Sequence, residues 1–270
     1  MKAVGAAFLA IGLAVTPEIA RAGESAAPFA GAYVGVNAGG AFGSSHHKTD
    51  PGCPPAAANA VFCGAAPDAS AVNGTAVGGS GSGDFSSTGF TGGIQAGYNK
   101  RKDDIVFGVE ADFGLMDLGK SESAAGTFPF AFLGTSYALE QTMSTDWLAT
   151  LRGRLGRAVM PKLLLYVTGG VAFTDFKFTS RYSDNAVDIT FPGGTGYGSE
   201  SGIRAGWTLG AGGEWQLDDL WSVKAEYLYT DFGSMSFDVP TSNTPAFTQT
   251  MRVEADLRTH ILRVGLNYRF

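Results

Sequence analysis

The sequence predicts an all-β protein, an eight-stranded antiparallel up-and-down transmembrane β-barrel. Three observations lead to this fold class. Segments of about ten residues that alternate apolar and polar side chains recur along the chain. Only 16% of the 270 residues are charged, and 39 are glycine, whereas about a quarter of an ordinary soluble domain is charged. Beyond the first residues no apolar run reaches the roughly 20 residues of a helical membrane span, so strands must cross the membrane.

The chain begins with the features of an export signal. Met1 and Lys2 form a short positive start, residues 3–15 are apolar, and Ala20 and Ala22 place small residues where signal peptidase reads the chain. The apolar run is too short for a spanning helix. We therefore expect residues 1–22 to be a signal peptide cleaved after Ala22, and residues 23–270 to form the barrel domain.

Eight segments with a period of two follow the signal. In the third, the odd residues from Ile105 to Leu115 are apolar, whereas Glu110 and Asp112 lie on the opposite face with glycines. The fourth likewise sets Leu151 and its odd neighbours against arginines. An alternation of this kind predicts strands with one apolar face. The predicted strands are 32–42, 88–99, 104–116, 144–157, 162–178, 203–217, 221–232 and 256–270.

A soluble β-sandwich would also show this alternation, and the polar face separates the two architectures. That face is mostly glycine and threonine with a few charges, which suits a narrow enclosed lumen better than a wet surface. Slipping the fourth strand by one residue would turn two arginines to lipid, at about 2 to 4 kcal/mol each near the midplane. We expect a lumen charge lattice made by Glu110, Asp112, Arg152, Arg154, Glu214, Lys224, Glu226, Arg263 and Arg269.

Connections between the segments alternate in length, which predicts the topology. The turns 100–103, 158–161 and 218–220 are short, while the connections 43–87, 117–143, 179–202 and 233–255 are long. Short periplasmic turns, long outer loops and both termini on the turn side are typical of outer-membrane barrels. Aromatic residues near segment ends predict girdles at the headgroup level: Tyr33, Tyr98, Trp147, Trp207, Trp215, Trp221, Tyr227 and Tyr268.

The two cysteines, Cys53 and Cys63, both fall in the first long connection. In an exported chain this spacing favours one disulfide that closes a loop. His46 and His47 precede them, but no Cys-x-x-Cys or His-x-x-x-His spacing frames a metal site. We expect a disulfide and no metal.

Three stretches carry a family resemblance: residues 164–173, 223–233 and the closing segment 263–270. Together they look like the small outer-membrane β-barrel family of alphaproteobacterial surface proteins, related to the OmpA transmembrane domain. The resemblance implies a place in the cell outer membrane and contact with outer-membrane lipids and lipopolysaccharide. We expect no peptidoglycan-binding domain after Phe270, which is a departure from the family pattern. The resemblance also implies an assembly signal, read by the barrel-assembly machinery, at Leu266, Tyr268 and Phe270. The long first connection with its cysteine pair also departs from the family pattern.

Charge and residue types restrict the function. A net charge of −6 removes the electrostatic basis for nucleic-acid binding. Lipid A-modifying enzymes need a histidine with a hydroxyl and a carboxylate; His260 shares its face with Leu262 and Val264, so we expect it at the lipid rim. A protease-like pair of Asp256 and His260 would need a larger barrel. We expect no catalysis and no cofactor but a structural, envelope-integrity and surface-loop role, with a narrow porin-like channel as the alternative and a lipid A-modifying enzyme third.

Overall fold

The computed structural model describes residues 27–52, 67–129, 135–185, 193–242 and 248–270. The predicted signal peptide, with Ala20 and Ala22, lies outside the described residues, as do Cys53 and Cys63 and therefore the predicted disulfide. Within the described ranges, no helix combines the length and apolarity needed to cross a membrane.

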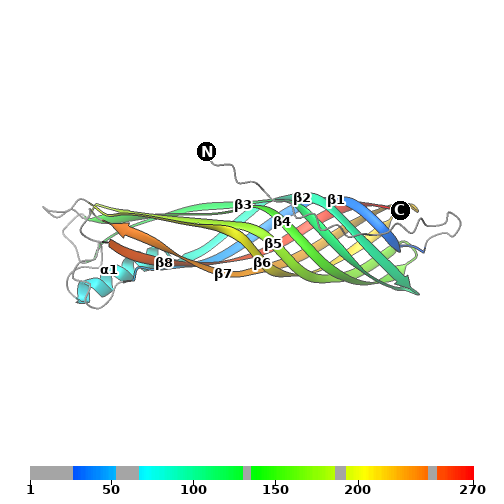
Figure 1. Ribbon diagram of the computed structural model, residues 1–270, viewed down its shortest axis with the longest axis horizontal. Coiled ribbons are helices and arrows are strands. Elements are labelled where there is room, and N and C mark those ends of the chain that lie inside the picture. Colours follow the sequence, from blue (N-terminus) through cyan, green and yellow to red (C-terminus); the bar gives the residue numbers. More distant parts are fainter. Residues whose placement is uncertain (1–26, 53–66, 130–134, 186–192, 243–247) are drawn as a thin grey trace.

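The described residues form one helix and eight strands that close into an antiparallel barrel, each strand pairing with its neighbours in the chain and β1 pairing with β8 (Figure 1). The predicted fold class, strand number and strand order are confirmed. The elements are β1 (Gly31–Asp50), α1 (Pro67–Ser80), β2 (Gly83–Lys102), β3 (Ile105–Thr127), β4 (Ser136–Met160), β5 (Leu163–Asp184), β6 (Thr195–Gln216), β7 (Trp221–Ser242) and β8 (Thr248–Arg269).

Every strand is longer than the predicted segment, by 5 to 11 residues. β8 has 22 residues; at about 3.3 Å per residue and a tilt of about 40°, it rises about 55 Å. The apolar band of an outer-membrane barrel is only about 25 Å tall. The strands therefore correct the predicted loop bounds: β-structure occupies large parts of the ranges 43–87, 117–143, 179–202 and 233–255.

The reason for this difference is that each strand continues beyond the predicted segment, while the apolar side chains change from the outward face of the strand to the inward face. We call the strand parts next to the short turns the turn half, and those next to the long connections the loop half. The turn half comprises residues 31–43, 90–102, 105–115, 147–160, 163–173, 207–216, 221–231 and 260–269; the loop half comprises 44–50, 83–89, 116–127, 136–146, 174–184, 195–206, 232–242 and 248–259.

In the turn half, most outward side chains are apolar and most inward ones are polar, with Val106, Leu164, Leu228 and Ile261 among the buried apolar exceptions. On β3, for example, Val109 and Phe113 are 57% and 53% exposed, while Glu110 and Asp112 between them are buried. A strand with this alternation suits lipid outside and a polar lumen inside. The turn half thus forms the membrane-spanning band that the sequence predicts.

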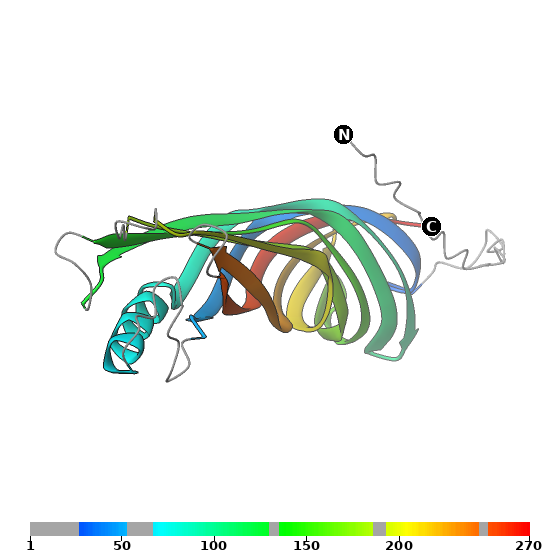
Figure 2. The same ribbon diagram turned by 60° about the vertical axis from the view of Figure 1, so that its left-hand side comes forward.

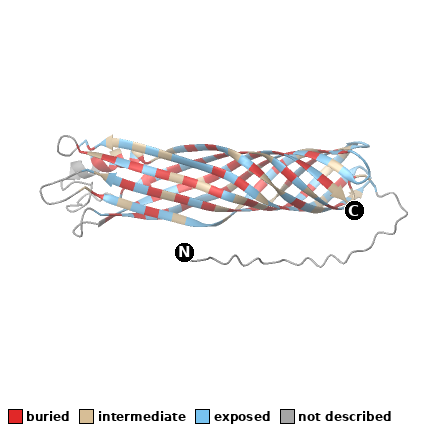
Figure 3. Cartoon of the chain, turned by 90° about the horizontal axis from the view of Figure 1, so that it is seen from above, coloured by how far each residue is buried: buried red, intermediate tan, exposed pale blue. Residues whose placement is uncertain are grey.

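In the loop half, the same pleat continues with the opposite chemistry. On β8, Met251 and Val253 are fully buried inside the barrel, while Arg252 and Glu254 are exposed on its outside. Buried and exposed residues alternate along most of the strand length in both halves (Figure 3), whereas the outer parts of β3 and β6 are mainly exposed or intermediate. The loop half is therefore a water-facing structure with its own apolar core, which contains Phe85, Met116, Leu139, Met143, Phe176, Phe178, Phe237, Val239, Met251 and Val253.

β-bulges lie where the two halves meet. The strand register shifts between Leu115 and Leu118, between Ser144 and Leu148, and between Asp231 and Ser234. At the third bulge Gly233 has φ +67°, a conformation that glycine adopts without strain. The Asp231 carboxylate accepts a hydrogen bond of 2.9 Å from the Gly233 amide and so fixes the bulge.

The loop half also divides into two sheets (Figure 2). Among the described residues, β2 and β3 pair no further than Phe90 with Asp117. β6 and β7 do not pair with each other between Gly196 and Trp207 of β6, and they pair again only at their tips. One sheet therefore contains β7, β8, β1 and β2, the other contains β3 to β6, and the apolar core lies between them. Helix α1 packs at the loop end, where Val77 is fully buried in that core.

Candidate functional site

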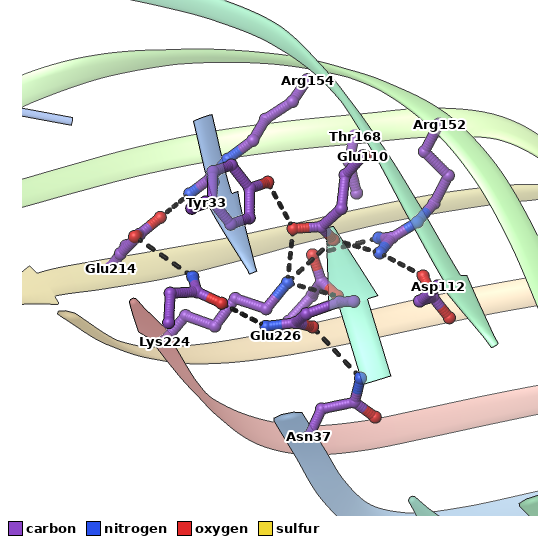
Figure 4. Close-up of polar contacts among 12 residues, drawn as sticks. Tyr33, Asn37, Glu110, Asp112, Arg152, Arg154, Thr168, Glu214, Lys224 and Glu226 are labelled. Carbon is purple, nitrogen blue, oxygen red and sulfur yellow. Dashed lines mark hydrogen bonds and ion pairs between the residues drawn. The ribbon is translucent and has the colours of Figure 1, made fainter. Parts of the chain in front are cut away.

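The lumen of the turn half holds a cluster of buried ion pairs (Figure 4). The inward faces of β3, β4, β6, β7 and β8 supply the charges because these residues alternate with the outward apolar ones. Four carboxylates and four cationic groups are each at most 8% exposed, so the cluster is neutral. Its members are Glu110, Asp112, Arg152, Arg154, Glu214, Lys224, Glu226 and Arg263.

Arg152 lies at the centre of the cluster. Its guanidinium is 2.5 Å from Glu110 Oε1, 2.8 Å from Asp112 Oδ2 and 3.0 Å from Glu226 Oε1. Three carboxylates from two strands thus surround one planar cation, a geometry that the fixed fork of arginine suits.

Arg263 and Lys224 complete the centre from β8 and β7. Arg263 pairs with Asp112 at 3.1 Å and with Glu226 at 2.7 Å. Lys224 Nζ lies 2.8 Å from both oxygens of Glu110. Every carboxylate at this level therefore faces at least two cationic groups, which offsets the cost of burying it.

A further ion pair, beside the central group around Arg152, lies nearer the short turns. Arg154 pairs with Glu214, and its guanidinium carbon lies 3.7 Å above the centre of the Tyr166 ring. Ser222 donates to Glu214 at 2.5 Å, and Asn267 donates to it at 3.3 Å. This pair closes the lumen at the turn end.

The structure brings together eight of the nine predicted lattice residues and leaves out Arg269. That residue shares the inward parity but lies at the mouth, where Nη2 donates to the Asp219 carbonyl at 2.6 Å. Because the neighbouring turn reaches the strand end, a backbone oxygen replaces the predicted carboxylate partner.

Two tyrosines belong to the site although the sequence patterns did not identify them. Tyr33 is buried, and its hydroxyl donates to Glu110 at 2.6 Å; Tyr166 donates to Glu226 at 3.0 Å. Tyr33 therefore lies inside the lumen and not in the expected girdle. Tyr33 lies on the same face of β1 as Asn37, another inward polar residue, and this shared parity is the sequence signal that places Tyr33 in the lumen.

The aromatic residues on the outside form two groups. Near the short turns, Trp221 and Tyr268 pack with ring centres 5.1 Å apart. Near the bulges, Trp207 and Tyr229 are 5.2 Å apart, and Tyr229 also contacts His260. These groups lie at the two ends of the apolar band, where amphipathic rings prefer the headgroup level.

The candidate assembly residues lie on the outside of the turn end. Leu266 is 39% exposed on the lipid-facing side of β8, and Phe270 is 71% exposed beyond its end. The rings of Tyr268 and Phe270 are 5.3 Å apart in an edge-to-face arrangement. The three side chains therefore share an accessible face.

The three histidines lie outside the lumen cluster. His260 faces outward, and its Nδ1 lies 2.6 Å from the Tyr227 hydroxyl. Asp256 accepts a hydrogen bond from the His46 amide and pairs with Arg258. His46 and His47 point to opposite sides of β1, and the described residues contain no group of three metal-liganding side chains.

Comparisons with known proteins agree with this architecture. Residues 6–270 match the family model described as outer membrane protein beta-barrel domain. The 31 kDa outer-membrane immunogenic protein of Brucella melitensis is 35% identical over 193 residues, which cover 71% of this chain and 70% of the relative. The 22 kDa outer membrane protein of Rhizobium leguminosarum is 32% identical over 161 residues, 58% of this chain and 61% of the relative.

Among solved structures, Neisserial surface protein A is similar with a TM-score of 0.35 and 14% identity, covering 89% of this chain and 98% of that one. The family match spans the lumen cluster, both aromatic groups and the terminal strand. The chain belongs to the outer-membrane β-barrel family of small alphaproteobacterial surface proteins and is located in the outer membrane.

Proposed function

We propose that the protein is a non-conducting, non-catalytic structural component of the outer membrane that presents its long connections at the cell surface. The observation that supports this proposal is that side chains fill the barrel interior in both the turn half and the loop half. The ion-pair cluster fills the turn half, and the apolar core fills the loop half.

Either filling opposes the passage of ions. An entering ion has to break the paired charges of the cluster and then lose its water in an apolar core. A cavity at the turn end, lined by Tyr33, Asn99 and Glu214 among others, has a volume of about 20 Å³. That is room for about one water molecule.

The proposed surface role rests on the orientation of the barrel. The short turns face the periplasm in this family of folds, so the loop half projects outward. The Brucella relative is named an immunogenic outer-membrane protein, which supports exposure of the corresponding part of this chain. Its partners in this proposal are outer-membrane lipids and lipopolysaccharide around the barrel, and the barrel-assembly machinery, which reads Leu266, Tyr268 and Phe270 during insertion.

Planar-bilayer recording tests the proposal against the channel alternative. The purified protein, shown by heat-modifiable gel migration to be folded, should give no steady conductance, while a large porin in the same setup gives open channels. Arg152→Ala should remain closed because the apolar core still blocks the path, and Arg152→Ala combined with Phe178→Ala should leak. A steady wild-type conductance that changes on replacement of Arg152 or Glu226 would refute the structural role.

The non-catalytic part of the proposal has its own test. His260→Ala should leave the lipid A composition of producing cells unchanged in mass spectra. A changed acyl pattern, restored by the wild-type gene, would instead establish the enzymatic alternative.

A further inference from the structure

His47 is buried inside the loop half, in a place where a charged group is costly. Its side chain is 3% exposed. The imidazole stacks on Phe85 with ring centres 4.2 Å apart and an angle of 15°, and the Phe178 ring is 6.3 Å away. The neutral ring thus packs as part of the apolar core.

The side chains packed directly against His47 carry no charge. Nδ1 is buried and has no hydrogen-bond partner among the described residues. The packed positions on β5 and β8 are apolar, namely Phe178 and Ala255. Gln141 on β4 carries no charge; its amide nitrogen donates to Thr49 and to the Gly81 carbonyl, and its side chain also favours the protonated imidazole through a hydrogen bond, an effect smaller than that of burial.

Three charged or titratable groups act on the imidazole from further away. Glu122 has the inward parity of β3, whereas His46 and Asp84 are exposed on the outer face, where they pair at 2.9 Å. Glu122 on β3 and Asp84 on β2 favour the protonated ring, while His46 on the same strand disfavours it. Burial is the largest of these effects and lowers the pKa of His47 below its usual value. His47 is therefore neutral in the packed loop half at neutral pH.

The face of β1 that carries His47 also anchors helix α1. Thr49, two residues further along, donates to the Gly81 carbonyl at 2.5 Å, and its amide donates to Ser82 Oγ at 3.0 Å. His47 pairs with Gly83, the first residue of β2. The junction between α1 and β2 therefore rests directly beside the imidazole.

A second set of contacts holds the helix to the opposite sheet. The Tyr137 hydroxyl donates to the Ala76 carbonyl at 2.9 Å and lies 2.8 Å from Ser80 Oγ. Val77 is buried in the apolar core between these contacts. The helix thus bridges β1 and β4 at the loop end, over the seam where β2 and β3 no longer pair.

We propose that His47 is an acid-sensitive latch: protonation drives its imidazole out of the apolar core toward Glu122, and this movement releases α1 from the loop end while the turn half stays folded. The packed state binds no proton on His47, whereas the released state binds one. The latch is therefore closed well above pH 6.5 and weakens as the pH falls below that value.

Hydrogen–deuterium exchange of the whole protein in lipid nanodiscs tests the latch. After correction for intrinsic exchange, the protection of α1 and of residues 45–50 should fall about 30-fold between pH 7.5 and pH 5.0, the limit set by a released histidine of ordinary pKa. His47→Phe keeps the stacking without a titratable group and should abolish the change. His46→Gln, on the exposed side of the same strand, is the matched control and should retain it.

Three results would overturn the proposal: equal protection at both pH values in the wild type, a retained fall in His47→Phe, or an equal fall in the turn half, which would indicate acid unfolding of the whole barrel. If His47→Phe does not fold, His47→Gln replaces it, with lower protection at both pH values and no difference between them. The latch concerns the loop half alone, so its test is independent of the conductance experiment.

Discussion

The turn half and the loop half are built from the same eight strands but bury opposite kinds of side chain. In the turn half, Arg152 and Glu226 are buried while Val109 is exposed; in the loop half, Phe178 is buried while Glu254 is exposed. The pleat is continuous, so backbone geometry does not cause the difference. The surroundings do: lipid lies outside the turn half, and water lies outside the loop half.

This comparison shows that alternation by itself does not indicate which side of a strand is inside. The inward face is polar where the outside is apolar, and apolar where the outside is wet. Bulges at Leu115, Ser144 and Asp231 and the aromatic pair Trp207 and Tyr229 mark the boundary. The predictions below test whether the two halves are stabilised by the different interactions that this boundary implies.

The largest expected effect is in the lumen cluster. Arg152→Ala leaves the carboxylates of Glu110, Asp112 and Glu226 without their shared partner, and it should lower the free energy of unfolding by about 3 to 5 kcal/mol. Urea unfolding in lipid vesicles, followed by heat-modifiable migration, measures it. Arg157→Ala removes an exposed arginine from the same strand, with a side chain 74% exposed, and should cost below about 1 kcal/mol. Equal losses would mean that the cluster adds no stability beyond a surface pair.

Next comes the apolar core of the loop half. Phe178 is fully buried and lies 5.7 to 6.5 Å, between ring centres, from Phe85, Phe176 and Phe237. Phe178→Ala should cost about 3 to 5 kcal/mol through lost packing and a cavity, and the loss should appear as faster hydrogen exchange in the loop half. Phe173→Ala changes a 39% exposed ring on the same strand and should cost clearly less, because lipid chains fill the space. Faster exchange confined to the turn half would contradict two separately packed halves.

The position of the membrane boundary is tested by placing an arginine at either of two outward positions of β3. Val109 and Ser121 both face outward, in the turn half and the loop half respectively. Val109→Arg should cost about 2 to 4 kcal/mol because it places a charge against lipid, whereas Ser121→Arg should change stability by no more than about 0.5 kcal/mol. Unfolding from vesicles measures both. Similar costs at the two positions would move the boundary toward the loop end.

The smallest effect is expected at an exposed pair beside the fourth-strand bulge. Lys177 Nζ lies 2.5 Å from Asp146 Oδ2, and this hydrogen bond lowers the pKa of the Asp146 carboxyl. Both side chains are about half exposed or more, so a double-mutant cycle of Asp146→Asn and Lys177→Gln should give about 0.2 to 1 kcal/mol. This contribution is present above the ordinary aspartate pKa and is lost as the pH falls through the lowered one. A coupling that is unchanged at pH 2 would exclude the ion pair as its source.

The sequence was sufficient to predict the barrel, its eight strands and the polarity of the turn half, because a period of two with lipid on one side leaves a clear pattern. It did not give the strand ends. On β8 the apolar set changes from Leu262 and Val264 to Met251 and Val253, which have the opposite parity. In the sequence alone, where the end of the membrane is not marked, this change of parity looks the same as a one-residue shift of strand register or the start of a loop.

Most residues of the lumen cluster can be predicted from the alternation of side chains along each strand alone. Glu110 and Arg263 could be assigned to the lumen because their neighbours in the chain are apolar, and the structure pairs them with other lumen charges. Tyr33 is the exception: its position near a strand end predicts a girdle residue, whereas its parity places it in the lumen, and the structure follows the parity. The partner of Arg269 is a turn carbonyl, and no pattern of side chains reveals a backbone partner.

The long strands of the loop half have a consequence for anything that approaches the cell. About half of a rise of roughly 55 Å lies beyond the apolar band, so the strand tips stand about 25 to 30 Å above the hydrocarbon boundary. In the proposed orientation, a particle or protein that approaches the cell meets the strand tips of the loop half before it reaches the membrane surface.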